Sequence, residues 1–187
     1  MALFSRTTLI TDLLDRTEVL KVNTRAFGRL TDEQLRQSPE PGRWSISEIY
    51  AHLNLCLDQS IRLILSRVTL APDSPSDVYR SGLLGDWIYD RAMPRPDGSV
   101  LKLKARKAWC ADTGAIDARE ELGLFEHHCD ALDDILRHAS TKDLRRISIP
   151  FFPPLVQLRL GDMLRFLVAH GERHLLQAQR VMIPQVV

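Results

Sequence analysis

The sequence predicts an all-α protein in which four long helices form a four-helix bundle with one long crossover connection. Apolar residues recur at helical spacing in four segments, near residues 7–29, 45–70, 114–139 and 161–182. The stretch 71–113 separates the second segment from the third and contains four prolines and an Asp-Gly turn signal. Because such a stretch cannot continue either helix, we expect it to be the crossover.

The first segment, near residues 7–29, has apolar side chains on one helical face and charged residues between them. These apolar residues are Leu9, Leu13, Leu20 and Phe27. Thr31 and Gln34 then have the spacing of a capping box, which opens a helix. This spacing predicts a short helix, and the prolines and glycine at 39–42 predict the loop that follows it.

The second long helix has a clear start signal. Ser45 is followed three residues later by Glu48, which makes a second capping box. An apolar stripe continues from there to about residue 70: Ile46, Ile49, Leu53, Leu57, Ile61 and Ile64. Trp44 directly precedes the cap, so we expect its ring to pack this helix end against the bundle.

The crossover contains weaker signals for regular structure. Residues 85–93 fit one or two helical turns, and the alternating residues at 100–104 do not require a strand. Connections of this length in compact domains often carry function.

The remaining segments complete the bundle. The third helix has an apolar inner face: Ile116, Leu122, Phe125, Leu132 and Leu136. The apolar, proline-rich stretch 148–158 predicts an extended segment over one end of the bundle. The last helix ends before Pro184, because proline cannot continue a helix.

Length and composition are those of an ordinary globular protein. A chain of 187 residues suits one domain, which we expect to span residues 1–187. Hydrophobic residues make up 44% and charged residues 26%, which argues against disordered and disulfide-scaffold classes. The net charge of +1 favours neither nucleic acid nor a membrane as a partner. The local basic run at 102–107 is typical of a solvated surface.

The sequence also predicts a cytoplasmic protein. The three cysteines, Cys56, Cys110 and Cys129, lie far apart and form no CxxC pair or secreted disulfide framework. The N-terminus lacks the basic stretch and apolar core of a signal peptide. No apolar run approaches the ~18 residues that span a bilayer.

The last helix carries the sequence HGERH, in which His170 and His174 are four residues apart. Residues at this spacing share one helical face, with Cβ atoms roughly 5–6 Å apart, so the two imidazoles can chelate one metal ion. The pair alone is a weak signal, because the spacing is common. However, the two histidines continue the apolar row of Met163, Leu167 and Ala178. Buried imidazoles need polar partners, and one metal ion would serve both.

A third ligand is expected from another helix, and His52 is the candidate. It lies one turn after Ile49, at the edge of the apolar stripe. The alternative is a core histidine that is hydrogen-bonded to a neighbour. Cys56, one further turn along, could line the same cavity or be a small buried residue. His127 and His128 are adjacent, so they cannot both face the interior.

Two segments resemble the signature stretches of the DinB/YfiT superfamily of four-helix proteins: PGRWSISEIYAHL at 41–53 and LGDMLRFLVAHGERHLLQAQRV at 160–181. The family pattern is a Trp-Ser helix start with a histidine about two turns later, and a final helix with H-x-x-x-H followed by glutamine. The matching residues are Trp44, Ser45, His52, His170, His174 and Gln177. The sequence LKARKAW at 103–109 also resembles the connection into the family's third helix.

The resemblance implies a bundle in which His52, His170 and His174 bind one divalent metal ion, commonly zinc or nickel. It also implies a small-molecule substrate and, in many members, a homodimer. In characterised relatives the metal serves chemistry on low-molecular-weight thiols, as in thiol S-transferases and a mycothiol-dependent isomerase. The resemblance assigns no catalytic residue beyond the metal ligands.

Three neutral imidazoles leave a divalent ion with its full charge and with open coordination positions, as in catalytic sites. A thiol or water bound there has a lowered pKa. This favours thiol S-transfer to a small electrophile or metal-dependent hydrolysis. The alternative is a non-enzymatic protein, for example in a stress response, whose metal or histidines bind a ligand or stabilise the fold. Glu48 could orient His52, act as a base or only cap its helix, whereas Glu172 is expected to face solvent.

Overall fold

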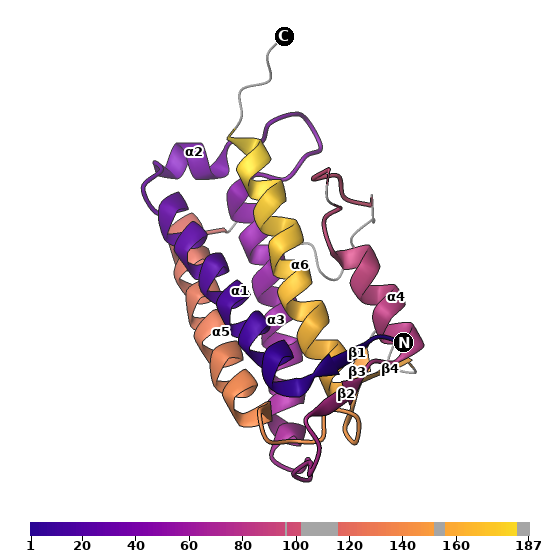
Figure 1. The fold of residues 1–187 in the computed structure, drawn as a ribbon. Helices are drawn as coiled ribbons and strands as arrows, with labels where there is room; N and C mark the ends of the chain where they lie inside the picture. The colour runs from indigo at the N-terminus through magenta and orange to yellow at the C-terminus, as the bar shows by residue number, and fades with distance from the viewer. Residues whose placement is uncertain (96, 102–115, 152–155, 183–187) are drawn as a thin grey trace.

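The structure is a computed structural model that describes residues 1–95, 97–101, 116–151 and 156–182. Four long helices form the bundle that the sequence predicts (Figure 1). They are α1 (Arg6–Phe27), α3 (Ile46–Val68), α5 (Ala118–Ala139) and α6 (Leu160–Val181). The predicted fold class is therefore confirmed, and the helix bounds differ from the predicted ones by four residues at most.

Local capping sets where the helices begin. At the start of α3, the Glu48 side chain accepts a hydrogen bond from the Ser45 backbone N–H at 2.8 Å, and the Ser45 hydroxyl accepts one from the Glu48 N–H. The other predicted capping box opens the short helix α2 (Asp32–Arg36). α5 begins at Ala118, later than predicted, because the Asp117 carboxylate caps the first turn.

The long helices are arranged so that each contacts two others. α1 and α3 both pack against α5 and α6, so the order around the bundle is α1, α5, α3, α6. In Figure 1, α1 and α6 run upward while α3 and α5 run downward. Neighbouring α3 and α5 are therefore parallel, and the chain must return along the bundle between them. This return is why the crossover is long.

The described part of the crossover contains a longer helix than the sequence predicts. α4 (Leu83–Ala92) packs beside α6, and it buries Ile88 and Ala92. Tertiary packing of these residues extends the one or two predicted turns to ten residues. The predictions made for residues 102–113, including the basic run and the family-like connection, lie outside the described residues.

Two small antiparallel sheets cover the end of the bundle where α6 begins (Figure 1). They pair β1 (Leu3–Ser5) with β2 (Val78–Arg80), and β3 (Ser148–Phe151) with β4 (Val156–Arg159). The extended segment predicted at 148–158 is thus found in its described residues, although its strand pairing was not predicted. Ile149 and Leu158 are opposite each other in the register and are both buried, which anchors this sheet to the core.

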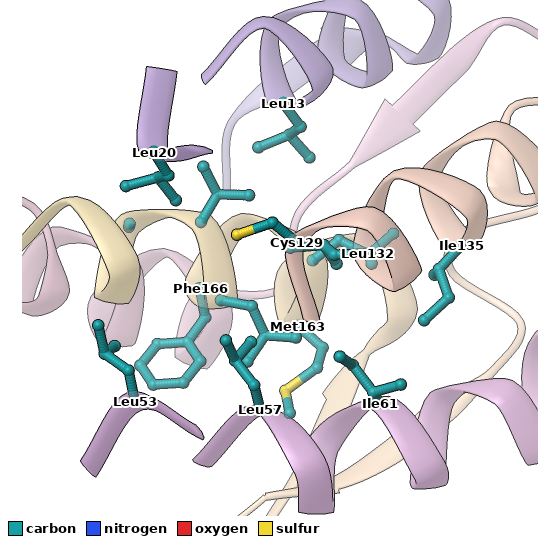
Figure 2. Close-up of a cluster of buried hydrophobic side chains, with 14 of the residues drawn as sticks. Leu13, Leu20, Leu53, Leu57, Ile61, Cys129, Leu132, Ile135, Met163 and Phe166 are labelled. Carbon is teal, nitrogen blue, oxygen red and sulfur yellow. The ribbon is translucent and has the colours of Figure 1, made fainter. Parts of the chain in front are cut away.

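Apolar side chains from all four long helices meet in the interior of the bundle (Figure 2). Those labelled in the figure are Leu13 and Leu20 of α1, Leu53, Leu57 and Ile61 of α3, Cys129, Leu132 and Ile135 of α5, and Met163 and Phe166 of α6. The apolar faces of the four long helices are thus buried against one another in the core of the bundle. Across the residues that the structure describes, no helix has the continuous apolar stretch that a bilayer span needs.

A buried polar contact holds the first turn of α6 against the segment before α4. The Asp162 carboxylate accepts hydrogen bonds from the Tyr79 hydroxyl at 2.6 Å and from the Gly82 backbone N–H at 2.9 Å. The Tyr79 ring lies against Gly161, where an added Cβ atom would come within 2.5 Å of the ring. Because this approach leaves no room for a side chain, residue 161 has to be glycine for the two segments to meet in this way.

Candidate metal centre

The three histidines predicted as ligands lie close together inside the bundle. His52 is in the second turn of α3, whereas His170 and His174 are in the second half of α6. α3 and α6 run in opposite directions, so these regions are at the same end of the bundle (Figure 1). The ring centroids of His170 and His174 are 4.6 Å apart, and that of His52 lies 5.4 and 4.7 Å from them. The fold therefore brings the three predicted residues together.

The two imidazoles of α6 have the spacing that one metal ion requires. Nε2 of His170 and Nε2 of His174 are 3.2 Å apart. Two nitrogens bound to a tetrahedral zinc ion, each about 2.0–2.1 Å from it, are separated by about 3.3 Å. The backbone thus already places this pair of donors at a distance that fits a divalent ion.

Gln177 selects the tautomer of His174. Nδ1 of His174 lies 3.0 Å from Oε1 of Gln177, and because an amide oxygen only accepts, Nδ1 carries the hydrogen and donates it. The lone pair of His174 is then on Nε2, which faces His170. A hydrogen bond of this kind from the distal ring nitrogen is the usual way in which a histidine ligand is oriented.

Aromatic rings enclose the histidines on two sides. The Trp44 ring centroid lies 4.9 Å from that of His52 and 6.3 Å from that of His174. Phe166 stacks on His170 with 5.3 Å between centroids. His52 and His174 are buried, whereas His170 and Trp44 are partly exposed. The centre is therefore largely shielded from water but can be reached from the side of His170 and Trp44.

Cys56 is a further donor at the edge of this centre. Its Sγ lies 3.9 Å from Nε2 of His52. Donor atoms of Cys56, His52 and His170 all lie within 4.8 Å of one another. Burial raises the pKa of the Cys56 thiol to about 12, so without a metal the sulfur is protonated at neutral pH. The thiol is thus a donor close to His52 and His170, while His174 approaches the same place through its Nε2, 3.2 Å from that of His170.

The two carboxylates considered from the sequence have structural partners. Glu48 caps α3 through Ser45. Glu172 does not face solvent, so that prediction is wrong: it is half-buried and accepts hydrogen bonds from Arg16 at 2.6 and 2.7 Å, because α1 packs beside α6. Within the described ranges, the clustered donors at this centre come from histidine and cysteine, not from carboxylates.

Burial keeps the histidines of α6 neutral. It lowers the pKa of His174 to about 3 and that of His170 well below its ordinary range, and the neighbouring imidazoles strengthen both shifts. Neutral imidazole is the form that binds metal ions. The centre therefore needs no deprotonation of these two residues before an ion binds at neutral pH.

Acidification should destabilise the metal-free protein. The pKa of His174 is lower in the folded chain than its unfolded value of about 6.5, so protons bind preferentially to the unfolded chain as the pH falls below that value. From this residue alone, the free energy of unfolding should fall by about 2 kcal/mol between pH 7 and pH 5. Urea unfolding of metal-free wild type and His174→Gln at both pH values measures this, and an equal loss in the two proteins would contradict it.

Some features of the centre were not found by sequence reasoning. In the sequence, Phe166 has the pattern of an ordinary core residue. Only its position one turn before His170 could have indicated that its ring stacks on the His170 imidazole. Arg173 is buried beside the pair, although arginine is usually exposed. Of the adjacent histidines, His128 alone is buried, with Nδ1 at 3.0 Å from Oδ1 of Asn54.

Comparison with known proteins gives a family and a similar fold. The sequence profile of the DinB superfamily matches residues 17–178. Among solved structures, the chain is similar to YfiT from Bacillus subtilis, a probable metal-dependent hydrolase with an unusual four-helix bundle topology. The TM-score is 0.59 at 16% identity, over 92% of this chain and 85% of YfiT. No curated protein matches the sequence.

Proposed function

We propose that this chain, which belongs to the DinB superfamily, is a metal-dependent enzyme that activates the thiol of a small molecule for transfer to a small electrophile. The observation that carries the proposal is the convergence of the His52, His170 and His174 rings with no carboxylate donor from the described residues. We take the three imidazoles as the ligands and Cys56, whose thiol pKa is raised to about 12 by burial, as a residue that lines the site. A structural zinc site has four protein ligands, whereas three leave a position for a substrate or water.

His52, His170 and His174 are the residues that would hold the divalent ion, for which zinc and nickel are the candidates. Such an ion, when bound, lowers the pKa of a thiol or water beside it and so supplies a nucleophile near neutral pH. Gln177 keeps the ring of His174 in the tautomer that leaves Nε2 available. Trp44 adds an apolar wall beside two of the rings.

In the proposed reaction, the sulfur of the small thiol forms a bond to an electrophilic carbon and the thiol proton is released. The electrophile's leaving group departs with the bonding electron pair. We assign no side chain as general base, since Glu48 caps α3 and Glu172 is paired with Arg16. The protein's part is therefore to hold the donors, orient them and limit access by water.

Metal-dependent hydrolysis is the second candidate. It is favoured by the similarity to YfiT, which is described as a probable metal-dependent hydrolase. The same histidines would serve it, with water in place of the thiol as nucleophile. A non-enzymatic metal- or ligand-binding protein is the remaining alternative, and it predicts no turnover with either nucleophile.

A reconstitution experiment separates these functions. The chain is stripped of metal with a chelator, reloaded with zinc or nickel, and given a panel of small electrophiles with and without cysteine or 2-mercaptoethanol. We expect thiol consumption at least about tenfold above the rate of the thiol alone, and only when metal, protein and thiol are all present. Thiol-independent turnover would instead indicate hydrolysis, and no turnover across the panel would favour the binding protein.

A further inference from the structure

Arg173 places a positive charge inside the protein next to the metal centre. Its side chain is 8% exposed, and its guanidinium donates hydrogen bonds to two backbone carbonyls, those of Arg91 at the end of α4 and Leu101. Carbonyl oxygens satisfy some of the guanidinium donors but do not neutralise the charge. No described residue supplies a counter-ion, and a buried charge without one is costly, so the site around Arg173 favours an anionic ligand.

Other basic side chains buried in the bundle have carboxylate partners. The Lys21 ammonium lies 2.7 Å from Asp133, and the Arg165 guanidinium lies 2.8 Å from Asp86. Arg173 differs from both, since it makes no ion pair with any residue of the described ranges. Burial also lowers its pKa. Among the buried cations of the described residues, Arg173 thus lacks the carboxylate partner that Lys21 and Arg165 have.

The position of Arg173 on α6 relates it directly to the candidate ligands. It follows His170 by three residues, so the two are neighbours on the helix surface, and it immediately precedes His174. The charge of Arg173 contributes to the lowered pKa values of both histidines, which agrees with this proximity. A molecule that reaches the partly exposed His170 therefore also comes near Arg173.

We infer that Arg173 binds a carboxylate group of the small thiol substrate and so selects anionic thiols over neutral ones. This inference rests on the proposed function, because it assumes that the thiol reaches the metal centre. The planar guanidinium can make two parallel hydrogen bonds to a carboxylate, which gives both affinity and orientation. The thiol end of the same molecule is then directed toward the histidines. Arg173 is thus a specificity-determining residue for the substrate.

Cobalt(II) gives a readout that does not depend on turnover, because its visible absorption changes when a thiolate binds. The cobalt-loaded full chain is titrated with 3-mercaptopropionate and with its neutral analogue 3-mercaptopropionamide. In wild type we expect the carboxylate to bind about 10- to 100-fold more tightly, as for one charge-assisted pair. In Arg173→Gln this preference should fall close to unity while the cobalt content stays unchanged.

Arg180→Gln is the matched control. Arg180 lies two turns further along α6, and its guanidinium also donates a hydrogen bond to a backbone carbonyl of the crossover, that of Gly98. Unlike Arg173, however, Arg180 is exposed to solvent. It should keep the wild-type preference. If Arg173→Gln does not fold, Arg173→Lys is measured instead, and its preference should fall several-fold because lysine cannot form the two-bond fork.

Two results would overturn the inference in distinguishable ways. Equal binding of the two thiols to wild type, or a preference that persists in the Arg173 variant, would show that Arg173 does not select the carboxylate, while thiol binding itself would stand. No spectral change with either thiol would reject the proposed thiol chemistry together with the inference.

Discussion

Replacing His174 with alanine should abolish stable metal binding. His174 is 7% exposed, and its Nε2 lies 3.2 Å from that of His170, so the substitution removes one donor of the closest pair and leaves two imidazoles. Loss of a residue that only orients a ligand lowers metal affinity about 10- to 100-fold, so loss of the ligand itself should lower it at least about 100-fold. Elemental analysis after dialysis should fall from about one ion per chain to almost none, and any activity should fall with it.

Cys56→Ser is the control for this prediction. Serine keeps a small side chain at the position but removes the sulfur that lies 3.9 Å from His52. If the three imidazoles form the site, this variant should retain the ion and most of the activity. Loss of metal from Cys56→Ser would instead indicate a closed site that includes the thiolate, and the metal would then have a structural role.

Gly161→Ala should destabilise the protein by about 2 kcal/mol. The new methyl group would lie 2.5 to 2.9 Å from three atoms of the Tyr79 ring. The ring is buried, and its hydroxyl is bonded to Asp162 at 2.6 Å, so it cannot move aside without losing that bond. Guanidinium unfolding measures the change, with circular dichroism at low denaturant to show that the helices are intact.

Gly123→Ala gives the opposite expectation from the same chemical change. Gly123 lies within α5, and an added Cβ atom there has nothing within 4 Å. Alanine should therefore stabilise the protein by about 0.5–1 kcal/mol through its higher helix propensity. If Gly161→Ala were as stable as Gly123→Ala, the close packing of Tyr79 on α6 would be incorrect.

The features of the fold that depend on local sequence could be predicted. Ser45 and Glu48 are three residues apart, so the start of α3 could be found without knowing what packs around it. Pairing of β1 with β2 could not, because these strands are far apart in sequence and too short to have a clear alternation. The length of α4 was likewise decided by its packing against α6.

In the candidate site, too, the features set by local sequence could be predicted and those set by tertiary packing could not. His170 and His174 could be paired from their spacing, and His52 from its place on the apolar stripe, because each position follows from helical periodicity. The environment of Glu172 and Arg173 could not be predicted in this way. Both depend on which neighbour covers each side of α6, α1 for Glu172 and the end of α4 for Arg173. Helical periodicity places a side chain on a face but does not say what lies opposite.

The donors of the centre come from distant parts of the chain, and this has a consequence for biosynthesis. His52 is encoded in the first third of the sequence, whereas His170 and His174 are close to its end. During translation the chain cannot assemble the three-imidazole set until almost all of it has been made, and nascent chains that stop earlier cannot carry the ion there. If the three imidazoles bind an ion, the ion should therefore be acquired late, after translation, and only by chains in which α3 and α6 have already packed together.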